Sequence, residues 1–225
     1  MKAILCAAVA GMLIGPVTAS AQGPRPWLML GGSVNSFSMG DVNDEIAAIN
    51  AAITPLRMDE MKTGFGFGGG FGLDLTQTVS LAIAYERLTV SSEVGDASGS
   101  LKYDFPANVF AAQVTYFAPS ERPFLLGAGA SVGRISSAGK VALSISGSGA
   151  ISGDVSGSGP VAEGFAAGSL RAGEKVAIVS NLGYRYAKIA ETKVDGTVVY
   201  NADGSKYSLD YSGLMARVML KFALH

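Results

Sequence analysis

The sequence has little of what catalytic and metal-binding sites are usually made from. It contains one cysteine and one histidine in 225 residues. A single cysteine excludes a disulfide framework and a cysteine-based zinc site, and a single histidine excludes most other metal sites. Long apolar runs are also missing, because nothing after Gln22 approaches the roughly 18 consecutive apolar residues of a transmembrane helix. A protein that crosses a membrane with helices is therefore excluded.

Charge is scarce and balanced. Charged residues make up 16% of the chain, with 17 Lys+Arg against 18 Asp+Glu, whereas ordinary domains have about 25%. Because there is no positive excess and no local Lys/Arg cluster, binding of nucleic acid through its phosphates is excluded. Hydrophobic residues reach 48%, which excludes a disordered coil. What is abundant is glycine, with 30 residues.

The N-terminal segment has the pattern of a secretory signal peptide. Lys2 precedes an apolar run from Ala3 to Ile14, and the small-x-small site Ala19-Ser20-Ala21 follows a Gly-Pro breaker. The run is about 12 residues long, short of the roughly 20 that a membrane anchor needs. We therefore expect a signal peptide over residues 1–21, cleaved after Ala21, and a single mature domain over residues 22–225.

Alternation of apolar with small or polar residues is the dominant pattern of the mature chain. Between Gly64 and Leu75, phenylalanine and leucine occupy one face, and glycine and Asp74 the other. A period of two is typical of a β-strand, and each such segment is long enough to cross a bilayer when tilted, which takes about 9–11 residues. The eight predicted strands cover residues 27–37, 64–75, 79–90, 108–118, 124–136, 162–171, 176–187 and 209–224.

The connections between these strands alternate strictly between long and short, with 26, 3, 17, 5, 25, 4 and 21 residues. Membrane barrels sort their loops in this way, with short periplasmic turns and long extracellular loops. A soluble β-sandwich is the alternative, but a solvated sheet face gains nothing from glycine. The pattern predicts an all-β fold, an eight-stranded antiparallel transmembrane up-and-down β-barrel with one short helix in the first extracellular loop.

The signal segment, the eight alternating strands, the glycines on one face and the loop pattern together resemble the small outer-membrane β-barrels. This family is typified by the OmpA transmembrane domain and its OmpX- and OmpW-like, porin-family relatives. The resemblance covers about residues 27–224 and implies a location in the Gram-negative outer membrane. Its implied partners are outer-membrane lipid, lipopolysaccharide and the assembly machinery, with any extracellular partner unknown. The family usually ends on an aromatic residue, whereas here Phe222 is followed by Ala223, Leu224 and His225.

Several polar side chains fall on the inward face of the predicted strands. An eight-stranded barrel has an interior that side chains fill, and a buried charge needs a partner. We expect Glu86 to meet Arg185 or Arg217, and Asp74 to meet Lys221 near the periplasmic rim. A selectivity filter is the functional alternative. The remaining inward residues are the polar Gln113 and Asn181 and the bulky Leu125, Met215 and Met219, and the bulky ones favour a closed lumen.

Aromatic residues are expected to face lipid in two belts at the membrane interfaces. The predicted periplasmic belt contains Trp27, Tyr116, Phe124 and Phe222. The predicted outer belt contains Phe37, Phe65, Phe110, Phe165, Tyr184, Tyr186 and Tyr211.

The first and the later long connections have local patterns of their own. Asp41 as N-cap, the apolar positions Ile46, Ile49 and Ile53, and Pro55 as terminator predict a helix. Such a helix would close the barrel mouth, lie on the outer leaflet or bind a partner. Hairpins beyond the membrane are predicted from the alternation at residues 141–146 and from the turn residues 201–204.

No catalytic residue, cofactor or metal is predicted, and we expect the protein not to be an enzyme. Acyl-transferring barrels need a histidine base, and the only histidine is His225, beyond the last strand. Two functions remain. The first is a filled barrel that anchors in the outer membrane and presents long loops in a structural or surface-interaction role. The alternative is a small porin-like channel or carrier for small or apolar solutes.

Overall fold

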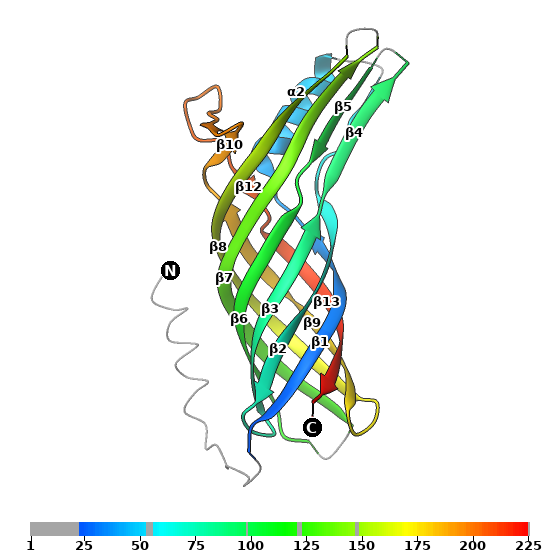
Figure 1. Ribbon diagram of the computed structural model, residues 1–225, viewed down its shortest axis with the longest axis vertical. Helices are drawn as coiled ribbons and strands as arrows, with labels where there is room; N and C mark the ends of the chain where they lie inside the picture. The colour runs from blue at the N-terminus through cyan, green and yellow to red at the C-terminus, as the bar shows by residue number, and fades with distance from the viewer. Residues whose placement is uncertain (1–22, 53–55, 98, 121–122, 147–148, 225) are drawn as a thin grey trace.

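The protein is a long β-barrel with a β-sheet extension at one end, as the computed structural model shows in Figure 1. The structure describes residues 23–224 except 53–55, 98, 121–122 and 147–148. The predicted signal peptide and His225 therefore lie outside the described residues, as do Ile53 and Pro55 of the predicted helix.

Eight strands form the barrel wall, and each is antiparallel to its neighbours. They are β1 (Arg25–Ser36), β2 (Thr63–Asp74), β3 (Val79–Thr89), β6 (Ala107–Phe117), β7 (Phe124–Ile145), β8 (Gly149–Arg171), β9 (Val176–Ile189) and β13 (Gly213–Ala223). The first and last strands pair with each other, from Trp27 opposite Ala223 to Asn35 opposite Met215. This pairing closes the ring and leaves no free sheet edge in the wall. The predicted eight-stranded up-and-down barrel is confirmed.

Alternation along the strands separates an apolar exterior from a filled interior. On β2, Phe65, Phe67 and Phe71 are 69%, 57% and 50% exposed, while the glycines at positions 64, 66, 68, 70 and 72 face inward and Gly69 faces outward. Large apolar side chains are exposed on all eight strands of the ring. An apolar belt of this kind fits the hydrocarbon region of a bilayer. No helix in the described part of the chain is long and apolar enough to cross a membrane.

The aromatic belts are only partly as predicted. The rings of Phe65, Phe110, Tyr116, Phe124, Tyr184 and Tyr186 are exposed on the outer surface, and Phe222 is half-buried. The prediction is wrong for Trp27, Phe37, Phe165 and Tyr211, which are buried. Inward-facing glycines make this possible, since a Cβ at Gly129 or Gly183 would collide with Phe165.

Strands β7 and β8 are 22 and 23 residues long, so the predicted ranges 124–136 and 162–171 are too short. The hairpin predicted at 141–146 is the continuation of these two strands. At about 3.3 Å per residue, 22 residues span roughly 70 Å, far more than a bilayer core of about 30 Å needs. A second hairpin, β4 (Ser91–Asp96) and β5 (Gly99–Asp104), was expected as loop and pairs with β7 beyond the belt. Together these strands build the extension.

The last long connection also contains short strands. They are β10 (Thr192–Val194), β11 (Thr197–Val198) and β12 (Leu209–Asp210). The predicted strand 209–224 is therefore interrupted, because β12 and β13 pair with β9 separately, on either side of Tyr211 and Ser212. The turn predicted at 201–204 lies in a loop that is closed by an isolated antiparallel β-bridge between Tyr200 and Lys206.

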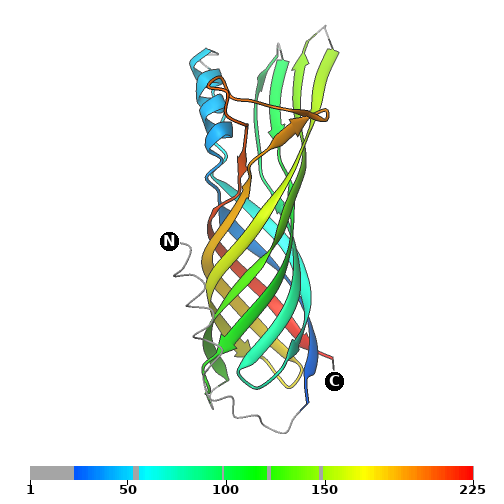
Figure 2. The ribbon, with the colours of Figure 1, turned by 90° about the vertical axis from the view of Figure 1, so that its left-hand side faces the viewer.

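The predicted helix is present as α2 (Gly40–Ala52), which stands beside the extension in Figure 2. It buries Val42 and Ile46 in an apolar cluster over the barrel mouth. Asp41 does not act as N-cap but lies in the first turn, and its carboxylate accepts hydrogen bonds from Ser208 N (2.7 Å) and Ser208 Oγ (2.9 Å). Burial raises the pKa of Asp41, but the hydrogen bonds from Ser208 outweigh it, so the pKa lies below its ordinary value.

Candidate functional site

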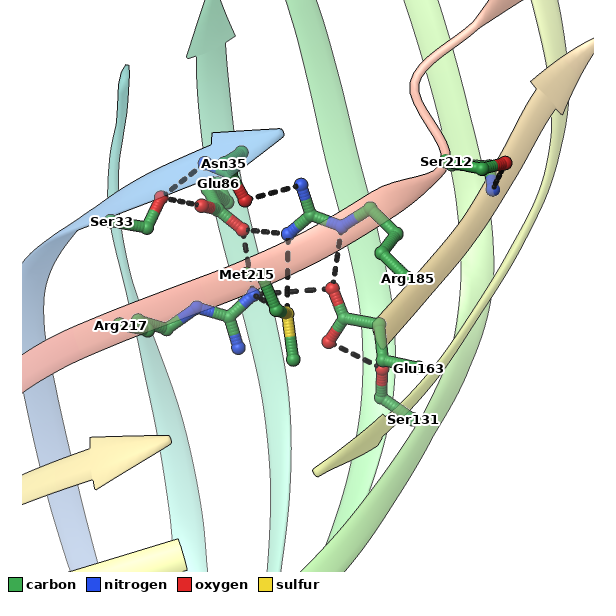
Figure 3. A network of polar contacts seen from close by, with 10 residues as sticks. Ser33, Asn35, Glu86, Ser131, Glu163, Arg185, Ser212, Met215 and Arg217 are labelled. Atoms are coloured by element: carbon green, nitrogen blue, oxygen red, sulfur yellow. Dashed lines mark hydrogen bonds and ion pairs between the residues drawn. The ribbon is translucent and has the colours of Figure 1, made fainter. Parts of the chain in front are cut away.

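Four charged side chains meet across the middle of the lumen, and each comes from a different strand (Figure 3). Glu86 lies on β3, Glu163 on β8, Arg185 on β9 and Arg217 on β13. Arg185 forms an ion pair with Glu86, and its Nε donates to Glu163 Oε1 at 2.8 Å. Arg217 Nη2 lies 2.7 Å from Glu86 Oε2 and 3.2 Å from Glu163 Oε1. Each acid therefore contacts both bases.

Uncharged side chains complete this lumen network, which we define as the four charges with Ser33, Asn35 and Ser131. Ser33 donates to Glu86, and Ser131 Oγ donates to Glu163 Oε2 at 2.8 Å. Asn35 donates to Ser33 Oγ at 2.7 Å and accepts from Arg185 Nη1 at 3.3 Å. All seven residues are buried. A buried charge cluster of this kind is tolerable because its charges balance and its hydrogen bonds are made within the cluster.

A glycine makes room for the network. Gly66 on β2 faces inward, and a Cβ there would collide with Ser33 Oγ and Glu86 Oε1. Backbone pairing also places Glu163 opposite Arg185 on the adjacent strands β8 and β9. The local structure thus sets both the space for the charges and their position.

The five site residues expected from the sequence fall into two groups. The structure brings Glu86 together with both Arg185 and Arg217, where the sequence left the choice open. Asp74 and Lys221 pair away from this network, at the end of the barrel where the short turns lie. Lys221 Nζ is 2.7 and 2.9 Å from the two carboxylate oxygens of Asp74. Lys221 Nζ also lies 4.5 Å from the centre of the Trp27 ring, a cation–π contact.

Sequence reasoning missed Glu163. The sequence gives little sign that Glu163 faces the lumen. Ala162, Gly164 and Ala166 on the other face of β8 are no more apolar than their neighbours, so hydropathy does not distinguish the two faces. Only the presence of one charge in a run of small and apolar residues marks the inward face.

An apolar layer and a small cavity lie on opposite sides of the network. One inward position further along toward the extension, Leu88, Val161 and Ala187 belong to the apolar cluster over the barrel mouth. On the opposite side, a cavity of about 20 Å³ next to Glu86 and Arg217 has room for one water molecule. Several buried polar atoms in the described lumen have no hydrogen-bond partner: Trp27 Nε1, Gln113 Oε1 and both amide atoms of Asn181.

A wider polar vestibule of about 260 Å³ opens at the end where the short turns and Lys221 lie. It does not share its lining with the small cavity beside the network. Among the described residues, no group of three or more His, Cys, Asp or Glu side chains is arranged to hold a metal ion. The geometry of the lumen is that of a filled interior with one open end.

Comparison with protein-family models gives no match, and comparison with curated proteins gives none either. Solved structures do match. Neisserial surface protein A (NspA) has 14% sequence identity and a TM-score of 0.50, over 89% of this chain and 99% of NspA. The outer membrane protein OprG from Pseudomonas aeruginosa has 8% identity and a TM-score of 0.48, over 89% and 96%. The outer membrane protease OmpT from Escherichia coli has 10% identity and a TM-score of 0.40, over 93% and 100%.

The closed ring of eight strands, the apolar exterior and the filled interior define a small outer-membrane β-barrel. The likeness to NspA shows this fold, and the resemblance found in the sequence is confirmed at the level of fold. The outer membrane is the location that this fold and the apolar belt indicate, in agreement with the sequence.

Proposed function

We propose that this protein is a closed anchor in the outer membrane and holds a rigid β-extension outside it, in a structural or surface-interaction role. The observation that carries the proposal is the lumen network, which crosses the barrel from Glu86 and Glu163 to Arg185 and Arg217. A charge-balanced, buried cluster with an apolar layer next to it fills a lumen, whereas a channel needs charges that face water.

The extension supports the second half of the proposal, because hydrogen bonds hold its segments in fixed positions. Glu45 of α2 accepts hydrogen bonds from Tyr103 on β5 (2.7 Å) and from Tyr207 in the last connection (2.9 Å). Asp41 adds its hydrogen bonds with Ser208. The helix is thereby fixed to two separate segments, and the surface that the extension presents is preformed.

The proposed partners follow from the surface. The apolar belt fits outer-membrane lipid and the acyl chains of lipopolysaccharide, and we propose that the outer-membrane assembly machinery inserts the barrel in the cell. We also propose that the protein is not an enzyme and that residues 1–21 are removed on export. Mass spectrometry of outer-membrane fractions should then find a mature chain that starts at Gln22, and recovery of intact chain in the inner membrane would overturn this point.

Single-channel recording tests the closed barrel against the channel or carrier. The refolded protein, inserted into planar bilayers, should show no steady ionic conductance. A variant with both Glu86→Ala and Arg217→Ala serves as a comparison, since it removes part of the network and leaves the charge balanced. Steady conductance of the unaltered protein would overturn the proposal and favour the small channel.

A further inference from the structure

A cavity of about 300 Å³ lies outside the apolar belt, where α2 and the last connection face the sheet extension. Its walls come from α2, β5, β7, β8 and β10, from Phe105 just after β5, and from Val199 and Tyr207 in the last connection. The walls are mostly apolar and include Phe105, Val141, Leu143, Val155, Val194 and Val199. No residue of the lumen network lines this cavity, so the role proposed for the closed barrel does not account for it.

The polar groups of the cavity are few and lie together. The Glu45 carboxylate is in the wall, with Tyr103 and Tyr207 each donating to a different one of its oxygens. An ionised carboxylate has about four acceptor sites, and the two tyrosines occupy two of them. Thr192 is also a wall residue, but it is 1% exposed and its hydroxyl is buried away from the cavity.

The tyrosines stay protonated under all physiological conditions. Burial, followed by the neighbouring Glu45, raises the pKa of Tyr103, and the same two causes raise the pKa of Tyr207. They therefore remain neutral donors to Glu45. No cationic side chain is in the cavity wall, so the negative charge of Glu45 is the one that a bound molecule would meet.

The geometry points to a binding site for a small apolar molecule that carries one hydroxyl or amino group. The apolar body would lie against Val155 and Val194, and the polar group would donate to Glu45. Ligand pockets range from about 300 to 1,000 Å³, and a cavity of about 150 Å³ holds one benzene ring. A molecule of one ring or a short alkyl chain fits this volume. Carboxylic acids of the same size should be rejected, because Glu45 repels them.

Three probes with the same ring separate these cases: benzyl alcohol, benzylamine and benzoate. The full chain, labelled at isoleucine, leucine and valine methyl groups, is placed in lipid nanodiscs and titrated with each probe. The alcohol and the amine should shift the Val155 and Val194 methyl signals in a saturable way, with benzoate at least about tenfold weaker. Shifts that rise linearly without saturation, or equal binding of benzoate and benzylamine, would overturn the proposal.

Matched variants locate the site. Val155→Trp fills the cavity and should abolish saturable binding, whereas Ser156→Trp places the same ring on the exposed face of β8 and should not. Glu45→Gln should remove the preference for amine over acid. If Val155→Trp fails to fold, Glu45→Gln decides, and an unchanged preference for amine over acid in it counts against the site. The conductance measurement is independent, so failure here leaves the closed barrel unaffected.

Discussion

Removal of one charge from the lumen network should cost the barrel a large part of its stability. Arg185 is the most buried member, with its side chain 1% exposed, and it contacts both Glu86 and Glu163. Arg185→Met keeps the bulk of the side chain but leaves two carboxylates facing Arg217 alone. An uncompensated buried charge of this kind costs roughly 3–5 kcal/mol. We expect the free energy of unfolding to fall by that amount.

A second substitution that restores the balance should recover much of this loss. Glu163→Gln with Arg185→Met leaves one acid and one base, so the double variant should lose much less than the sum of the single variants. The coupling energy expected for charges in contact is about 1–3 kcal/mol. Asp74 and Lys221 provide the internal comparison, because their side chains are 33% and 18% exposed. Their coupling should be smaller, no more than about 1 kcal/mol.

The measurement uses the only tryptophan of the chain, Trp27, which is 4% exposed inside the barrel. Its fluorescence should report unfolding in urea from lipid vesicles, with the free energy obtained by linear extrapolation. Additive effects of Arg185→Met and Glu163→Gln, together with a steady conductance of the unaltered protein, would refute the reasoning. In that case the charges line water rather than fill the lumen.

Three further predictions test separate parts of the structure. Gly66→Ala should destabilise the barrel by about 1–3 kcal/mol in the same urea assay, whereas Gly164→Ala, which has open space around it, should be neutral; equal effects would contradict the crowding. Phe165→Ala should cost about 3–5 kcal/mol because the ring is buried, and a loss no greater than that of the outward-facing Phe110→Ala would contradict its inward position. The depressed pKa of Asp41 stabilises the contact between α2 and the last connection at neutral pH. This contribution is lost as pH falls through that pKa, below about pH 3.9. The protection of the Ser208 amide against hydrogen exchange, corrected for the intrinsic exchange rate at each pH, should therefore fall in acid, and Asp41→Asn should remove this dependence; identical protection profiles of the two proteins would contradict it.

The barrel wall was predictable because lipid and lumen impose a period of two. Strands β1, β2, β3, β6 and β9 begin and end within two residues of the predicted positions. Their outward residues must be apolar to face hydrocarbon, and their inward residues small or polar to fit a narrow lumen. The alternation in the sequence therefore follows directly from these two environments.

The pattern fails where the two faces of a strand become similar. On β8 the outward residues Ala162, Gly164 and Ala166 are small, and the inward Phe165 is large. Alternation therefore predicted the wrong face for Phe165 and gave no role to Glu163. Beyond the membrane, both faces meet water or another segment, so the pattern gave the hairpin at 141–146 but neither its continuity with the strands of the wall nor the presence of β4 and β5.

The abundance of glycine and the scarcity of charge have one physical origin in this protein. The lumen of an eight-stranded barrel is just wide enough to be filled by side chains. A long arginine such as Arg217 reaches two acids across it only if some of the facing positions carry no side chain, and Gly66 beside Glu86 is such a position. Each buried charge must also be balanced by another, which limits how many the lumen can hold. The same residues that exclude a wide channel therefore produce a composition rich in glycine and poor in charge.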